Sequence, residues 1–195
     1  MNASHRREAS TTRVLCLAGS LRRDSWNRRL LAEAVRTAPK GLELILFDQL
    51  ADVPIFNEDT EQAEPAGVHQ LRSAVAMTDG LLVATPEYNH SIPGVLKNAV
   101  DWLSRGSPSV LVDKPVAIIG ASAGRWGTRL AQAALRQVLT ATEARVMPGP
   151  MLFVAQASEC FDVDRQLRDP KLASTLLGVV DAFRNWILLH NASAQ

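Results

Sequence analysis

RVLCLAGSLRRDSWN, residues 13–27, is the stretch that decides the fold. The run from Val14 to Ala18 is short and apolar and ends at Gly19, which predicts a strand buried on both faces, as in the middle of a parallel sheet. A helix is predicted over residues 27–38, because its apolar positions recur at helical spacing before Pro39. The chain therefore begins with a strand, a polar loop and a helix.

The same alternation repeats along the chain. Strands are predicted at residues 42–47, 80–85 and 114–122, with a weaker fifth strand between 144 and 155. Helices are predicted at 65–77, 93–102 and 128–140, and a last helix begins at Pro170 behind an Asp169 N-cap. That helix carries one apolar stripe of Leu172, Leu176, Val180, Phe183 and Ile187. The pattern predicts an α/β fold with a doubly wound, five-stranded parallel sheet and helices on both faces.

Length and composition limit the alternatives. The 195 residues are 47% hydrophobic and 21% charged, as in one globular domain, which we place at residues 13–190 between a disordered tail at 1–12 and a C-terminal tail at 191–195. A net charge of +1 argues against nucleic acid or an anionic membrane as partner. No stretch approaches the roughly 18 apolar residues of a membrane span.

The charges are unevenly distributed along the chain, and the cysteines and histidines are scattered. Residues 1–40 hold nine Arg or Lys and three acids, whereas residues 41–64 hold seven acids and no base. The two cysteines have no CxxC spacing and the four histidines are scattered, so no disulfide framework and no metal site is expected. A reducing, cytoplasmic location is predicted.

Ligands of open α/β sheets bind at the carboxyl ends of strands, so the loops after the first, third and fourth strands are compared. In the first loop, Ser20, Ser25 and Asn27 can donate hydrogen bonds to a phosphate, and Arg22 can add a charge-assisted contact beside a helix N-terminus. The alternative is that Asp24 or Ser25 only caps the helix. Neither GxGxxG nor GxxxxGK[ST] is present, which argues against Rossmann-type NAD binding and ATP hydrolysis.

The other two loops suit a planar ligand. TPEYNHSIPG, residues 85–94, is stiffened by prolines at both ends and presents Tyr88 as an aromatic surface. Glu87 and His90 lack a nucleophile and an orienting third group, which argues against hydrolysis. GASAGRWGT, residues 120–128, allows close approach of the backbone to a ligand. The alternatives are an ordinary rigid loop and a simple helix start.

Two motifs carry a family resemblance. GSLRRDSWN (19–27) and TPEYNHSIPGVLKNAVDWLSR (85–105) resemble the NADPH-dependent FMN reductase family, which includes flavin-dependent quinone, chromate and azo reductases. The resemblance extends over residues 13–140. It implies a flavodoxin-like fold with strand order 2-1-3-4-5 and one non-covalent FMN, reduced by NADPH or NADH. The phosphate binders it implies are Ser20, Arg22, Ser25 and Asn27; the residues along the isoalloxazine ring are Pro86, Glu87, Tyr88 and Asn89, with Ser122 and Gly124 approaching from the third loop.

The resemblance implies an activity as well. Electrons would pass from NAD(P)H through FMN to a small quinone-, azo-, flavin- or chromate-type acceptor by a ping-pong mechanism, with no catalytic side chain and no metal. A homodimer or homotetramer is implied, and Trp102, Arg105 and residues 106–110 are candidate interface elements. Arg125 and Trp126 depart from the family's glycine-dense third loop, and we hypothesise that Arg125 binds the 2′-phosphate of NADPH.

Two other classes of protein are consistent with such a fold. One is a flavodoxin-like carrier that binds FMN without NAD(P)H activity of its own. The other is a regulatory domain that has lost the flavin, and the intact polar set of the first loop counts against it.

Overall fold

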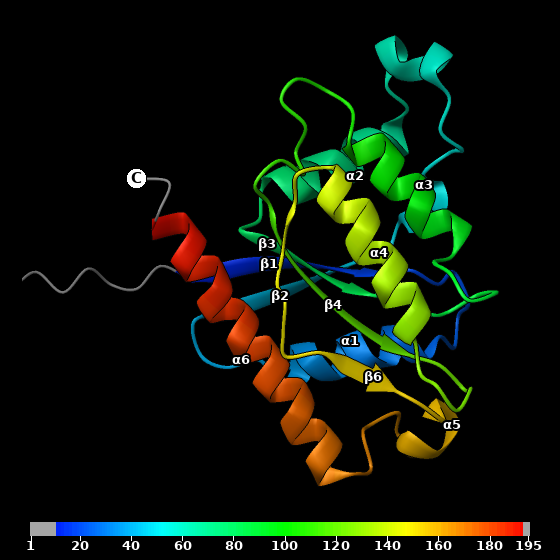
Figure 1. Ribbon diagram of the computed structural model, residues 1–195, viewed down its shortest axis with the longest axis vertical. Coiled ribbons are helices and arrows are strands. Elements are labelled where there is room, and N and C mark those ends of the chain that lie inside the picture. The colour runs from blue at the N-terminus through cyan, green and yellow to red at the C-terminus, as the bar shows by residue number, and fades with distance from the viewer. Residues whose placement is uncertain (1–10, 193–195) are drawn as a thin grey trace, which may run out of the picture.

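The computed structural model describes residues 11–192, and its centre is one parallel sheet with the strand order β2-β1-β3-β4-β5 (Figure 1). The register places Cys16 of β1 between Leu46 of β2 and Leu82 of β3. The predicted strand order is confirmed. The predicted tails lie largely outside the described residues, and β1 starts at Thr12, one residue before the predicted domain. The strands are β1 (Thr12–Ala18), β2 (Leu42–Phe47), β3 (Gly80–Ala84), β4 (Pro115–Ala121), β5 (Arg145–Val146) and β6 (Leu152–Val154).

Helices cover both faces of the sheet, as predicted (Figure 1). One face carries α1 and α6, whose Leu31 and Phe183 belong to one core cluster. The other carries α2, α3 and α4, whose Leu71, Trp102 and Leu135 belong to a second cluster. The helices are α1 (Trp26–Thr37), α2 (Ala66–Ala76), α3 (Gly94–Leu103), α4 (Arg129–Ala141), the short α5 (Ala157–Cys160) and α6 (Pro170–Ala192), with 3-10 turns η1 (Leu50–Asp52) and η2 (Glu58–Ala63).

The central strands show why an unbroken apolar run marks this sheet. Side chains of a strand alternate between its two faces. In β1, Val14 and Cys16 belong to the α1 and α6 core, whereas Leu15 and Leu17 belong to the opposite core. Both faces of the strand are covered, so no polar residue can be placed at alternate positions.

The fifth strand differs from the prediction. Instead of one strand between residues 144 and 155, two short strands pair with successive parts of β4. β5 lies opposite Pro115 and Val116, and β6 lies opposite residues 119–121. Pro148 and Pro150 fall between them, and a proline has no N–H to donate to a sheet ladder. The ladder is therefore interrupted there.

The long helix α6 confirms the predicted cap and stripe. The Lys171 N–H donates to Asp169 Oδ1 at 2.9 Å, and Leu176, Phe183 and Ile187 are fully or almost fully buried. Contrary to the sequence expectation, α6 is long and apolar enough by length and composition to cross a membrane. Its buried stripe packs against the sheet, which is the arrangement of an amphipathic helix that covers one face of an α/β sheet.

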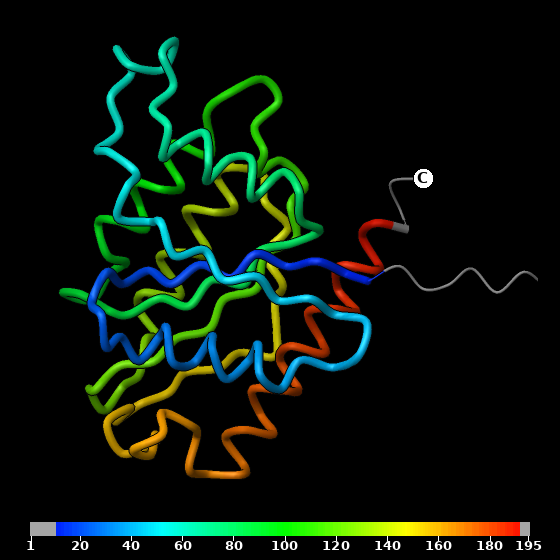
Figure 2. The backbone as a smooth tube through the Cα atoms, turned by 180° about the vertical axis from the view of Figure 1, so that it is seen from behind, coloured from blue at the N-terminus to red at the C-terminus, as the bar shows by residue number. Residues whose placement is uncertain are grey.

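The acidic segment after β2 projects from the top of the sheet in Figure 1 and returns beside α2 and α3, as Figure 2 also shows. Ion pairs join Glu64 to Arg72 and Glu61 to Arg105. Trp102 donates its indole N–H to the Pro54 carbonyl at 2.8 Å and is only 1% exposed. Trp102 is therefore a core residue of the domain, and its prediction as an interface element is wrong.

Candidate functional site

The polar loops after β1, β3 and β4 meet around a cleft of about 640 Å³ at the carboxyl edge of the sheet. The structure brings together there nine of the ten residues predicted to bind FMN, and only Asn89 does not line the cleft. The predicted residues that line it are Ser20, Arg22, Ser25, Asn27, Pro86, Glu87, Tyr88, Ser122 and Gly124. Sequence reasoning did not assign the other lining residues to the ligand; they are Trp26, His90, Ala121, Ala123, Trp126 and Gly127.

The first loop has the groups that an anion site requires. Ser25 is the N-cap of α1, and its hydroxyl accepts hydrogen bonds from the N–H groups of Asn27 and Arg28. This is the capping role weighed as an alternative, and it leaves the hydroxyl hydrogen free to donate. Within residues 11–192, the N–H groups of Leu21 and Arg23 make no hydrogen bond. Free donors, a helix N-terminus and the Arg22 guanidinium are what a phosphate dianion requires.

Asn27 joins the first loop to the third. Its side chain is 2% exposed; its Nδ2 donates to the Ala121 carbonyl at 2.9 Å and its Oδ1 accepts from the Ala121 N–H at 2.9 Å. Only one hydrogen of the amide is left for a ligand. Asn27 thus fixes the position of the two loops relative to each other.

The second loop is a tight hairpin. Tyr88 and Ser91 exchange two backbone hydrogen bonds of 3.0 Å, and the residues between them, Asn89 and His90, have φ angles of 49° and 63°. Two successive residues with positive φ in a two-residue loop are typical of a type I′ turn, and asparagine tolerates this conformation well. The turn places Asn89 at the tip and turns Tyr88, 50% exposed, toward Ser20, whose Oγ lies 3.4 Å from the tyrosine hydroxyl.

Glu87 has a structural partner that the sequence did not reveal. Its Oε2 accepts hydrogen bonds from the Leu130 N–H at 2.9 Å and the Ala131 N–H at 3.0 Å. The carboxylate thereby caps the N-terminus of α4, where a negative charge is stabilised. Because this side chain points at α4, the backbone of Glu87 is the part left to face a ligand.

The third loop closes the cleft with little side-chain bulk. Ser122 donates its hydroxyl to the Gly127 carbonyl at 2.8 Å, which holds the loop in a bend. Gly127 has a φ of 67°, a conformation that favours glycine. Trp126 projects from this loop and is 77% exposed, so it adds a further aromatic side chain to the lining of the cleft, which also includes Tyr88.

The arrangement fits a phosphorylated planar cofactor. Donors for a dianion lie at the β1 end of the cleft, and aromatic side chains with accessible backbone lie at the β3 and β4 ends. In the described part of the chain, no three His, Cys, Asp or Glu residues come together as a metal site. A parallel sheet of this order with such loops defines a flavodoxin-like, flavin-binding domain.

The comparisons with known proteins agree. The model of the NADPH-dependent FMN reductase family matches residues 12–159, and the chain belongs to this family. It is an oxidoreductase that uses FMN and NAD(P)H. It is 39% identical over 176 residues to an NAD(P)H-dependent FMN reductase of Pseudomonas aeruginosa, covering 90% of this chain and 95% of that protein.

Two further similarities cover most of the chain. A quinone reductase of Escherichia coli is 41% identical over 139 residues, which are 70% of this chain and 74% of that one. The solved structure of FerB, a flavoenzyme NAD(P)H:(acceptor) oxidoreductase from Paracoccus denitrificans, superimposes with a TM-score of 0.84 at 37% identity, covering 92% of this chain and 98% of FerB.

The helix cap at Glu87 yields a prediction. Glu87→Gln keeps the size of the side chain but removes the negative charge at the N-terminus of α4, and we expect a loss of about 1 kcal/mol in the free energy of unfolding. Urea unfolding of the flavin-loaded protein measures this loss. Glu58→Gln, an exposed glutamate in η2, is the control; an equal loss in both variants would refute the capping role.

Proposed function

We propose that this protein passes electrons from NAD(P)H to small quinone-type acceptors by a ping-pong mechanism, with azo compounds, flavins and chromate as further acceptors. When bound, FMN supplies the hydride and electron transfer chemistry. The protein supplies the binding site, orientation and the polar contacts around it. No side chain is assigned as an acid or base in this proposal.

The observation that carries the proposal is a single open cleft. Donors for a phosphate lie in the loop after β1, whereas Tyr88 and Trp126 of the loops after β3 and β4 line the cleft with half or more of their surface exposed. A flat nicotinamide and a flat acceptor would use this same open cleft, so they bind in turn. Alternate occupation of one place is the physical basis for a ping-pong mechanism.

The names of the relatives support the choice of acceptor. The Escherichia coli relative is a quinone reductase, and FerB is named for an unspecified acceptor. A cleft that also exposes aromatic side chains, Tyr88 and Trp126, fits planar acceptors of several kinds. Membership of a reductase family disfavours the alternative of a flavin carrier without NAD(P)H activity.

We propose a homodimer or homotetramer in the cytoplasm. Trp126 and Leu130 are both exposed apolar side chains next to the cleft, and a second subunit placed over them would bury this surface. Exposed apolar surface of this kind next to a ligand cleft is typical of a subunit contact. Analytical ultracentrifugation of wild type and Trp126→Glu would test this; a monomeric wild type would refute it.

The function is tested on purified, FMN-loaded protein. Anaerobic NADPH or NADH should abolish the yellow flavin absorbance, and 1,4-benzoquinone should restore it. Initial rates with both substrates varied should give parallel double-reciprocal lines. Protein that takes up no FMN would overturn the proposal, and protein that binds FMN but oxidises no NAD(P)H would favour the carrier.

A further inference from the structure

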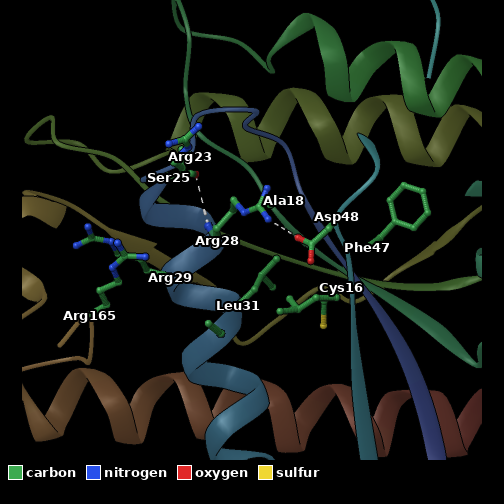
Figure 3. Close-up of a pocket in the computed structure, with 12 residues that line it drawn as sticks. Cys16, Ala18, Arg23, Ser25, Arg28, Arg29, Leu31, Phe47, Asp48 and Arg165 are labelled. Carbon is green, nitrogen blue, oxygen red and sulfur yellow. Dashed lines mark hydrogen bonds and ion pairs between the residues drawn. The ribbon is translucent and has the colours of Figure 1, made fainter. Parts of the chain in front are cut away.

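A second pocket, of about 300 Å³, surrounds the first turns of α1, with Arg28, Asp48 and Cys16 on the side of β1 and β2 and with Arg29 and Arg165 on the other side of the helix (Figure 3). Its lining has two parts: a polar rim and an apolar floor. The rim consists of Arg23, Ser25, Arg28, Arg29, Asp48 and Arg165, and the floor consists of Cys16, Ala18, Leu31, Ala32 and Leu46. Phe47 also lines the pocket, but its side chain belongs to the core on the other face of the sheet.

The rim is positively charged even after its ion pairs are counted. Arg28 is paired with Asp48, as the dashed line in Figure 3 shows. Arg29 and Arg165 share one carboxylate, that of Asp24, at 3.6 and 3.3 Å. Four guanidinium groups thus face two carboxylates, which leaves an excess of two positive charges.

Two of these arginines have unused hydrogen-bonding capacity. The Arg23 side chain makes no hydrogen bond or ion pair within residues 11–192. The Nε of Arg29 is buried and has no hydrogen-bond partner, and a buried donor without a partner costs free energy. The buried Arg29 Nε is out of reach of a ligand, but an anion with several oxygens would supply acceptors for the exposed Arg23 guanidinium and balance the excess charge.

The floor is suited to an apolar ring. Burial raises the pKa of the Cys16 thiol to about 12, so this floor residue is neutral at physiological pH. Leu46 faces the pocket with 40% of its surface exposed, because β2 is the edge strand of the sheet. The pocket therefore joins an apolar surface open to solvent with a dianion-binding rim, a combination that fits a nucleoside phosphate.

The position of the pocket relates it to the flavin cleft. Along the carboxyl edge of the sheet the strands end in the order β2, β1, β3, β4. The arginine pocket lies toward β2, the phosphate loop follows β1, and the aromatic walls of the cleft follow β3 and β4. Ser25 lines both the arginine pocket and the cleft, so the two meet at the start of α1. A dinucleotide with one ring in the cleft could run past the phosphate loop into the arginine pocket.

We propose that the arginine pocket binds the adenosine 2′-phosphate half of NADPH, with the purine on the apolar floor and the 2′-phosphate on Arg23 and Arg28. This inference rests on the proposed use of NAD(P)H. It replaces the hypothesis that Arg125 binds the 2′-phosphate. Arg125 belongs to the loop after β4, at the other end of the cleft, and lines neither the cleft nor the arginine pocket. The pocket would make NADPH the preferred donor over NADH.

Calorimetric titration of the FMN-loaded protein with adenosine 2′,5′-bisphosphate tests the proposal. Arg23→Ala and Arg28→Ala should each weaken binding about tenfold, the usual effect of losing a charge-assisted hydrogen bond. Arg28→Ala also leaves Asp48 as an unpaired negative charge beside the phosphate. Leu46→Asp should weaken binding through the floor, and 5′-AMP should bind wild type at least about tenfold more weakly than the bisphosphate.

Matched controls are available on the same chain. Arg145→Ala removes an arginine that is also ion-paired, with Asp113, but lies at the start of β5, and it should leave binding unchanged. Arg125→Ala should be unchanged as well. In steady-state kinetics Arg23→Ala and Arg28→Ala should raise KM for NADPH more than KM for NADH, whereas Leu46→Asp should raise both, because both dinucleotides carry the purine.

The outcomes separate the two proposals. A loss of bisphosphate affinity in Arg125→Ala but not in the pocket variants would overturn the inference. It would also be overturned if Arg23→Ala and Arg28→Ala lowered the affinity for 5′-AMP and for the bisphosphate by the same factor. If inorganic phosphate competed with the bisphosphate at an equal concentration, the apolar floor would contribute nothing to binding of the purine. Because calorimetry needs no turnover, a protein without NAD(P)H activity would contradict the proposed function and still report on the pocket.

Discussion

Arg22→Glu is expected to lower the affinity for FMN by about 100-fold. Arg22 is an exposed side chain in the phosphate loop, and it lines the cleft beside Ser20. Its replacement removes a charge-assisted hydrogen bond and places a carboxylate next to a phosphate dianion, and the two losses together correspond to about 3 kcal/mol. Equilibrium dialysis of the flavin-loaded protein, followed by measurement of free flavin, gives the dissociation constant.

The controls for Arg22 separate binding from stability. Arg145→Glu makes the same change of charge at an arginine of similar exposure far from the cleft, and its FMN affinity should equal that of wild type. Arg22→Lys keeps the charge but loses the planar fork of donors, so an intermediate affinity is expected. If Arg22→Glu retained FMN as well as Arg145→Glu does, the phosphate would have to lie elsewhere.

Gly120→Ala is expected to destabilise the fold by about 3 kcal/mol, the upper part of the range for overpacked cores. A Cβ at this position of β4 would stand 2.1 Å from Thr128 Oγ1 and 2.5 Å from the Thr85 carbonyl oxygen. The Thr85 carbonyl is backbone of the neighbouring chain segment and cannot rotate away, so β4 or the second loop must shift. Urea unfolding measures the loss in stability. The affinity for FMN should fall as well, because β3 and β4 both lead into loops that line the cleft.

A glycine without such neighbours is the matched control. Gly178 lies in the middle of α6, and a Cβ built there has nothing within 4 Å. Gly178→Ala should therefore stabilise the protein by about 1 kcal/mol, the ordinary difference between glycine and alanine in a helix. Equal stability of Gly120→Ala and wild type would show that β4 can relax without cost.

Most of the fold could be predicted because its signals are local. The runs at β1, β3 and β4 are apolar without alternation, which only a doubly covered strand allows, and helix spacing separates them. The predicted helices agree with α1 to α4 within about two residues at each end, which is the usual uncertainty of helix ends. The prediction of one continuous fifth strand was wrong because it rested on apolar content alone, and the prolines at 148 and 150 interrupt the hydrogen-bond ladder there.

The site was predictable as a set of loops but not as a set of contacts. Residue types after three strand ends were enough to bring nine of ten predicted residues to one cleft. The partners of Asn27 and Glu87 lie 94 and 43 residues away in sequence, and no local pattern encodes such pairs. The arginine pocket was missed for the same reason, since Arg165 and Asp48 reach α1 only in the folded chain.

The double hydrogen bond between Asn27 and Ala121 has a consequence for how the site is assembled. The residues proposed to surround the phosphate are all contained in the first 27 positions, yet the anchor that fixes their loop is the backbone N–H and carbonyl of Ala121 in β4. A polypeptide emerging from the ribosome therefore carries the complete phosphate motif long before it can hold it in shape. Flavin capture is expected only after β4 has joined the sheet, so a chain ending ahead of Pro115 would contain the motif and bind no flavin.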